Sequence, residues 1–127
     1  MTVKKVAVVM GGYSSEAEIS KKSGSVVIEA LSKGKYDPYA IYIERNNWYH
    51  LDDEGRKAPI DRSFFSCQID GQKVVPDIIF NTVHGTPGED GYLQAYWELL
   101  GIPQTSASFY SAALSFNKRD SLSVLKN

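Results

Sequence analysis

Residues 5–20 read KVAVVMGGYSSEAEIS, an apolar run that ends at two glycines and is followed by a helical pattern. The apolar residues do not alternate with polar ones, which is typical of a strand buried on both faces. The two glycines allow the backbone to turn sharply where this strand ends. Ser14 or Ser15 can cap the following helix, which places Glu16 in its first turn. The stretch therefore predicts a strand, a tight turn and a helix.

The carboxylate of Glu16 is the first candidate for function in this chain. Open α/β sheets bind their ligands at the carboxyl ends of parallel strands, and Glu16 follows such a strand end. A carboxylate at this edge attracts a ligand that carries a cationic group. We therefore predict that Glu16 lies in a ligand site.

Strands and helices are predicted to alternate along the rest of the chain, with residues 52–59 as a polar surface excursion. Further strands are predicted over residues 38–44, 48–51, 77–83 and 102–105, and a hairpin turn at Asp70-Gly71. Helices are predicted from Glu16 to Gly34, around residues 93–100 and 109–116, and from Lys118 onward. This order predicts an α/β fold in three layers, with a mostly parallel sheet and helices on both faces.

Apolar spacing predicts which side of each element faces the core. In the second strand, Tyr39, Ile41 and Ile43 fall on one side. One face of the first helix is predicted to carry Ile19, Val26, Val27, Ala30 and Leu31. The helix around residues 93–100 has the spacing i, i+3, i+4, i+7 in Leu93, Tyr96, Trp97 and Leu100.

Size, charge and cysteine content exclude several classes of protein. A chain of 127 residues suits one domain, and 14 basic against 15 acidic residues give a formal net charge of −1. Such a balance provides no field to attract nucleic acid or an anionic membrane, and no segment is long and apolar enough to cross a bilayer. The lone Cys67 favours a reducing cytoplasm, and its neighbours Phe64 and Phe65 indicate a packed thiol.

His84 ends a predicted strand and is followed by a glycine-rich loop over residues 85–91. Because parallel strands end at the same edge, His84 and Glu16 are expected to face one crevice. Position alone leaves both a functional and a structural role open for His84. The loop could hold an anion through its backbone amides, but Glu89 and Asp90 would repel a phosphate and are expected to cap the next helix.

Other common sites are excluded by their spacing. The glycine pair lacks the third glycine of G-x-G-x-x-G, and no G-x-x-x-x-G-K-[ST] loop is present. No serine lies in a G-x-S-x-G elbow. The histidines are His50 and His84, and neither has a cysteine or carboxylate at metal-ligand spacing, so no metal site is predicted. We expect His50 at the surface.

Four blocks of this sequence together resemble the D-alanine–D-alanine ligases in order and spacing. They are residues 11–20, 84–94, 102–105 and 111–118. The second block, HGTPGEDGYLQ, is the most specific. The resemblance covers essentially the whole chain but only the family's amino-terminal part, a Rossmann-like pre-ATP-grasp domain. It implies this domain over residues 1–116 and the start of a linker helix over 117–127, with the ATP-grasp region beyond. Ser106 and Asn117 depart from the glycine and aspartate that are usual in the family.

In that family, ATP phosphorylates the carboxylate of one D-alanine, and the amine of a second attacks the acyl phosphate to form the dipeptide of peptidoglycan. The resemblance implies that Glu16, the residue of this chain assigned to catalysis, recognises the ammonium group of the first D-alanine. It implies that Ile19 packs against the substrate methyl group and that His84 lines the pocket. Lys118 would reach the nucleotide phosphates. A core position for Ile19 and a solvated position for Lys118 are the alternatives.

The resemblance also implies the partners of the full-length protein. These are ATP with Mg²⁺ or Mn²⁺, held by residues outside this chain, the substrate D-alanine, and a second copy in a cytoplasmic homodimer. The chain by itself is expected to hold no cofactor and to be inactive. The alternative is a stand-alone module that binds a small ligand or dimerises without catalysis. The sequence beyond Asn127 would distinguish them, since only the ligase continues into an ATP-grasp region.

Overall fold

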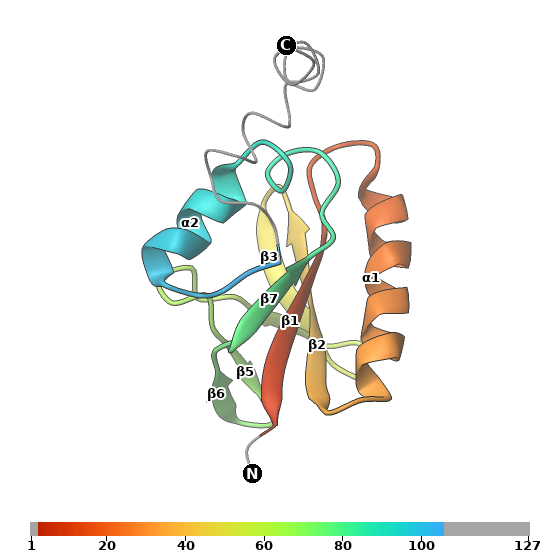
Figure 1. The fold of residues 1–127 in the computed structure, drawn as a ribbon, viewed down its shortest axis with the longest axis vertical. Coiled ribbons are helices and arrows are strands. Elements are labelled where there is room, and N and C mark those ends of the chain that lie inside the picture. Colours follow the sequence, from red (N-terminus) through yellow and green to blue (C-terminus); the bar gives the residue numbers. More distant parts are fainter. Residues whose placement is uncertain (1–2, 106–127) are drawn as a thin grey trace, which may run out of the picture.

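A computed structural model describes residues 3–105 of the chain, and these residues form an α/β fold. The described part contains a five-stranded sheet in the order β4-β3-β2-β1-β7 and a separate β5-β6 hairpin (Figure 1). The sheet strands are β1 (Lys4–Gly11), β2 (Tyr36–Glu44), β3 (Asn47–Leu51), β4 (Lys57–Pro59) and β7 (Ile78–Asn81). The other elements are α1 (Ala17–Ser32), β5 (Cys67–Ile69), β6 (Gln72–Val74) and α2 (Tyr92–Leu100).

The sheet is parallel at its centre and antiparallel at one side. β1 pairs in parallel with both β2 and β7, whereas β3 pairs antiparallel with β2 and with β4. Gln104 adds a parallel bridge to Ile79 at the β7 edge, where a strand over residues 102–105 is predicted. Helix α1 covers one face, and α2 lies over the other (Figure 1). The predicted three-layer α/β architecture is therefore confirmed.

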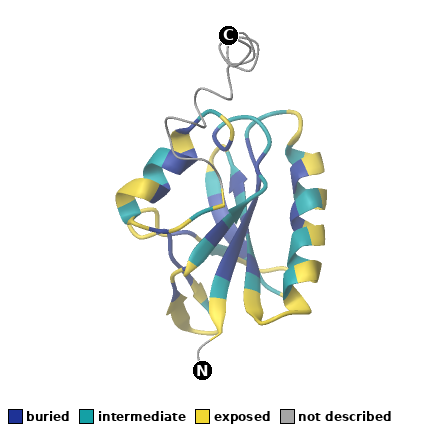
Figure 2. Cartoon of the chain, in the orientation of Figure 1, coloured by how far each residue is buried: buried dark blue, intermediate teal, exposed yellow. Residues whose placement is uncertain are grey.

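Strand β1 contributes side chains to both faces of the sheet, as its unbroken apolar run predicts. Val6, Val8 and Met10 pack toward α1, while Ala7 and Val9 belong to the larger core on the α2 side. All five side chains are buried, which makes β1 the buried centre of the fold (Figure 2). Because β1 is tightly packed on both faces, the backbone groups at its carboxyl end have fixed positions.

The predicted buried face of α1 is partly wrong. Ile19 and Val26 are 57% and 67% exposed, and Ala30 is exposed as well. The face that meets the sheet centres on Ser20 and Gly24, which are the buried residues of the helix. A Cβ atom on Gly24 would lie 2.5 Å from the Met10 methyl carbon, so the close approach of helix and strand requires a small residue there. Apolar spacing misses such a face because small residues carry no apolar signal.

Residues 52–59 are mostly exposed, as expected of a surface excursion, but Lys57–Pro59 within them forms the edge strand β4. A prediction for the neighbouring strand is wrong. His50, expected at the surface, is buried because β3 lies between β2 and β4. Its Nδ1 lies 2.8 Å from the carbonyl oxygen of Ala40, so the imidazole has a structural role in the sheet.

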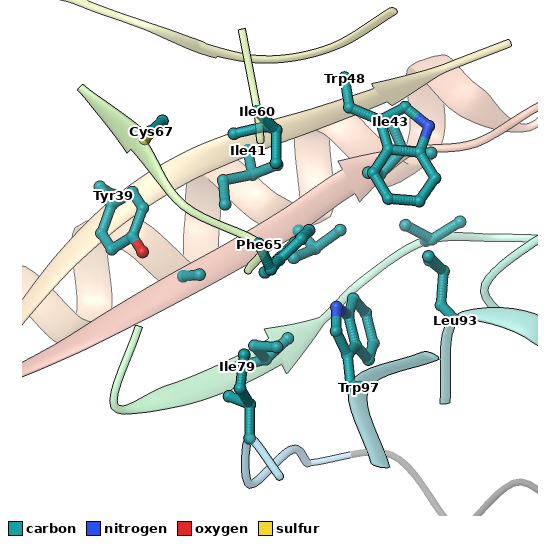
Figure 3. Close-up of a cluster of buried hydrophobic side chains, with 14 of the residues drawn as sticks. Tyr39, Ile41, Ile43, Trp48, Ile60, Phe65, Cys67, Ile79, Leu93 and Trp97 are labelled. Carbon is teal, nitrogen blue, oxygen red and sulfur yellow. The ribbon is translucent and has the colours of Figure 1, made fainter. Parts of the chain in front are cut away.

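The larger core lies between the sheet and α2 (Figure 3). The predicted alternation in β2 is confirmed, since Tyr39, Ile41 and Ile43 are all buried here. Trp97 of α2 is fully buried, and its ring centroid lies 5.7 Å from that of Phe65. The predicted hairpin turn is also confirmed, with Asp70 and Gly71 joining β5 to β6. Their φ angles of 53° and 78° match the type I′ geometry that Asp-Gly favours.

The other predicted helices, around residues 109–116 and from Lys118 onward, lie outside the described residues. So do the departures at Ser106 and Asn117 and the boundary between residues 116 and 117. Within residues 3–105, neither helix has the length and apolar character needed to span a bilayer.

Cys67 is buried in the larger core, which confirms the prediction of a packed thiol. Burial raises the pKa of this thiol to about 11. The unfolded chain releases the thiol proton at lower pH than the folded chain, so the free energy of unfolding should fall as pH rises from about 9 to 11. The free energy of unfolding, measured with urea across this pH range, should fall less steeply for Cys67→Ala than for the native sequence. Equal slopes would contradict the assignment.

Candidate functional site

The loops that follow β1 and β7 meet at the carboxyl edge of the sheet (Figure 1). The backbone N–H of Tyr13 donates a hydrogen bond to the carbonyl oxygen of Thr86 over 2.9 Å. At Gly12, with φ of 111°, a Cβ atom would lie 2.9 Å from a Val83 methyl group and 3.0 Å from the His84 carbonyl oxygen. Glycine is needed here because the two loops are in direct contact.

Three titratable side chains converge where these loops meet. Glu16, His84 and Glu89 each place one nitrogen or oxygen atom within 4.8 Å of the others. The His84 Nδ1 atom lies 3.8 Å from Glu89 Oε1. Glu16 and Glu89 are exposed, and His84 is half-buried, so a ligand has access to all three. The prediction that Glu16 and His84 come together at one edge of the sheet is confirmed by this geometry.

Glu89, which the sequence predicts to cap the next helix, instead belongs to this cluster. In the structure its carboxylate accepts a hydrogen bond from the backbone N–H of Gly85 and faces His84, so it holds the loop and not the helix. The N-cap residue of α2 is Gly91, which has no side chain to cap the helix. The Asp90 carboxylate accepts a 3.4 Å hydrogen bond from the backbone N–H of Tyr92, so Asp90 and not Glu89 contacts the start of α2. The signal available in the sequence was the position of Glu89 in the same loop as His84.

The start of α1 is attached to both strand ends through Ser20. Its side chain is fully buried, and its hydroxyl donates to the carbonyl oxygen of Thr82 over 2.7 Å. The Ser20 hydroxyl oxygen also accepts a hydrogen bond from the backbone N–H of Gly11 over 2.9 Å. These bonds fix the first turn of α1 against β1 and β7, and Glu16 is the residue directly before that turn.

The electrostatics of the cluster favour a cationic ligand. Within residues 3–105, no lysine or arginine forms an ion pair with Glu16 or Glu89. Two carboxylates with no lysine or arginine partner among these residues attract a compact positive group, whether an ammonium or a metal ion. The sequence predicts no metal site because no carboxylate is at metal-ligand spacing from His84. Folding brings Glu16 and Glu89 beside it, so this set of possible ligands is visible only in the structure.

Ile19 lies one helical turn after Glu16 and is 57% exposed, so its side chain is available to a ligand beside the cluster. The alternative of a core position for Ile19 is therefore wrong. Lys118, the candidate for nucleotide phosphates, lies outside the described residues.

A cavity of about 630 Å³ lies at the opposite edge of the sheet, where β1 and β2 begin. It is lined in part by Lys5 and Asp37, which pair over 2.8 Å, and by Arg56 and Asp52, which pair over 2.9 Å. Several of its charged groups thus have partners within the chain. The convergent carboxylates of Glu16 and Glu89 lie instead at the carboxyl edge, which remains the candidate site.

Comparisons with known proteins all point to one family. The family described as "D-ala D-ala ligase N-terminus" matches residues 5–107. D-alanine--D-alanine ligase from Flavobacterium johnsoniae is 52% identical over 124 residues, which are 98% of this chain and 38% of that protein. The chain thus spans well under half the length of this relative.

Solved structures agree with that comparison. The D-alanine-D-alanine ligase from Coxiella burnetii is 30% identical, with a TM-score of 0.86 over 99% of this chain and 41% of its own. D-alanine--D-alanine ligase from Bacillus anthracis, solved as a complex with ATP, is 27% identical, with a TM-score of 0.69 over 99% of this chain and 35% of its own.

Proposed function

Because this chain belongs to the family of D-alanine–D-alanine ligase amino-terminal domains, we propose that it binds the first D-alanine in an ATP-dependent ligase. The complete protein joins two D-alanines through an acyl phosphate, for use in peptidoglycan. This chain provides the amino-acid end of the site. The remainder of the protein provides the ATP-grasp region, the Mg²⁺ or Mn²⁺ ligands and most contacts to ATP.

The observation that carries this proposal is the convergence of Glu16, His84 and Glu89 within 4.8 Å at the carboxyl edge. The two carboxylates attract the ammonium group of D-alanine, and the nearby Ile19 offers an apolar contact to its methyl group. An amino acid anchored by its ammonium group presents its carboxylate away from these acidic side chains. That carboxylate is the group which ATP phosphorylates, so the cluster binds and orients the substrate.

We further propose that the complete protein works in the cytoplasm, where ATP is available, and that it forms a homodimer. Lys118 reaches the nucleotide phosphates at the entrance to the ATP-grasp region. The near-neutral formal charge of this chain supports a small-molecule substrate over nucleic acid.

Release of ADP in the presence of D-alanine tests the proposed function. The full-length protein should release ADP and phosphate as it forms the dipeptide, and residues 1–127 alone should release none because they lack most nucleotide contacts. Turnover by residues 1–127 would contradict the proposed division of the site. D-alanine binding without turnover by the full-length protein would favour the alternative of small-ligand binding without catalysis.

A further inference from the structure

We propose that Ser14 is a positioning residue that fixes the backbones of Glu16 and His84 relative to each other. This inference rests on the function proposed above. The Ser14 hydroxyl donates a hydrogen bond to the His84 carbonyl oxygen over 3.1 Å. The Ser14 hydroxyl oxygen in turn accepts a hydrogen bond from the backbone N–H of Glu16 over 3.1 Å. One hydroxyl thus connects the backbones of two site residues that lie far apart in the sequence.

A serine suits this position for chemical and steric reasons. Its hydroxyl carries one proton and two lone pairs, so it can donate to a carbonyl and accept from an amide at the same time. The loops also touch closely here, since a Cβ atom on Gly85 would lie 2.8 Å from Ser14 Oγ and 2.9 Å from Ser14 Cβ. Ser14 therefore fills the contact between the loop after β1 and the loop after β7.

Ser14 acts on the orientation of the site more than on the fold. The strand ends and the first turn of α1 are held independently by the buried hydroxyl of Ser20. The residue that precedes α1, Glu16, has no side-chain cap of its own, so the bond from its N–H to Ser14 restrains its backbone. Loss of the Ser14 hydroxyl removes this restraint on the Glu16 and His84 backbones, while the Tyr13–Thr86 hydrogen bond and the strands remain in place.

The test compares Ser14→Ala with Ser15→Ala, an exposed neighbour, in the full-length protein. Ser14→Ala should raise the KM for the first D-alanine about tenfold, the effect expected for the loss of two hydrogen bonds, and leave the KM for ATP unchanged. Ser15→Ala should change neither constant. On a Glu16→Gln background, Ser14→Ala should cause little further loss, because a positioning residue acts through the group that it positions.

A second readout does not depend on turnover. Hydrogen exchange of the Glu16 backbone amide, measured on the full-length protein, should become several-fold faster in Ser14→Ala, with no change at Ser20. Unchanged exchange at Glu16, or losses that add fully in the double variant, would overturn the positioning role. An inactive native protein would instead refute the proposed function, while the exchange measurement would still decide the role of Ser14.

Discussion

Glu16→Gln is expected to raise the KM for the first D-alanine by about 30- to 100-fold in the full-length protein. The substitution keeps the size of the side chain and removes its charge, so the substrate ammonium loses a charged partner. Loss of one member of such a pair costs about 2–5 kcal/mol, and the lower part of that range applies because Glu16 is exposed in this chain. Steady-state kinetics with D-alanine varied at saturating ATP would measure the change.

Glu18→Gln provides a matched control for this substitution. Glu18 lies two residues further along, is also exposed, and forms a 3.5 Å ion pair with Lys21 on the surface of α1. Surface pairs of this kind contribute little, so the KM for D-alanine should change less than twofold. Equal effects of the two substitutions would remove Glu16 from its proposed role. The thermal midpoint should remain the same in both variants, because neither side chain belongs to the core.

Trp97→Ala is expected to lower the free energy of unfolding of residues 1–127 by about 4 kcal/mol. Trp97 is completely buried between α2 and the sheet, where it packs edge-on against Phe65 at an interplanar angle of 64° (Figure 3). Removing the indole leaves a cavity in the core that the neighbouring side chains cannot fill. Urea unfolding followed by circular dichroism would measure the loss.

Leu99→Ala tests whether burial, and not the helix itself, accounts for that loss. Leu99 lies two residues after Trp97 on α2 and is 88% exposed. Its truncation should change the free energy of unfolding by no more than about 0.5 kcal/mol. A comparable loss in both variants would show that the cost arises from weakening of α2.

The sequence predicted the elements well where local chemistry decides them. The apolar run of β1, the alternation in β2 and the Asp70-Gly71 turn depend on residues close together in the chain. Prediction failed where a distant partner decides the environment. The residues next to His50 in the sequence give no sign of burial. His50 is buried because β3 pairs between β2 and β4.

For the candidate site too, sequence and tertiary structure determine different features. The sequence by itself determined that Glu16 follows a buried strand and that His84 follows another, because glycines and apolar runs mark both strand ends. Tertiary structure alone decided that Glu89 turns toward His84 instead of capping α2, and that Ser14 connects the two loops. Capping and loop contacts use the same polar atoms, and the choice between them depends on which groups folding brings within hydrogen-bonding distance.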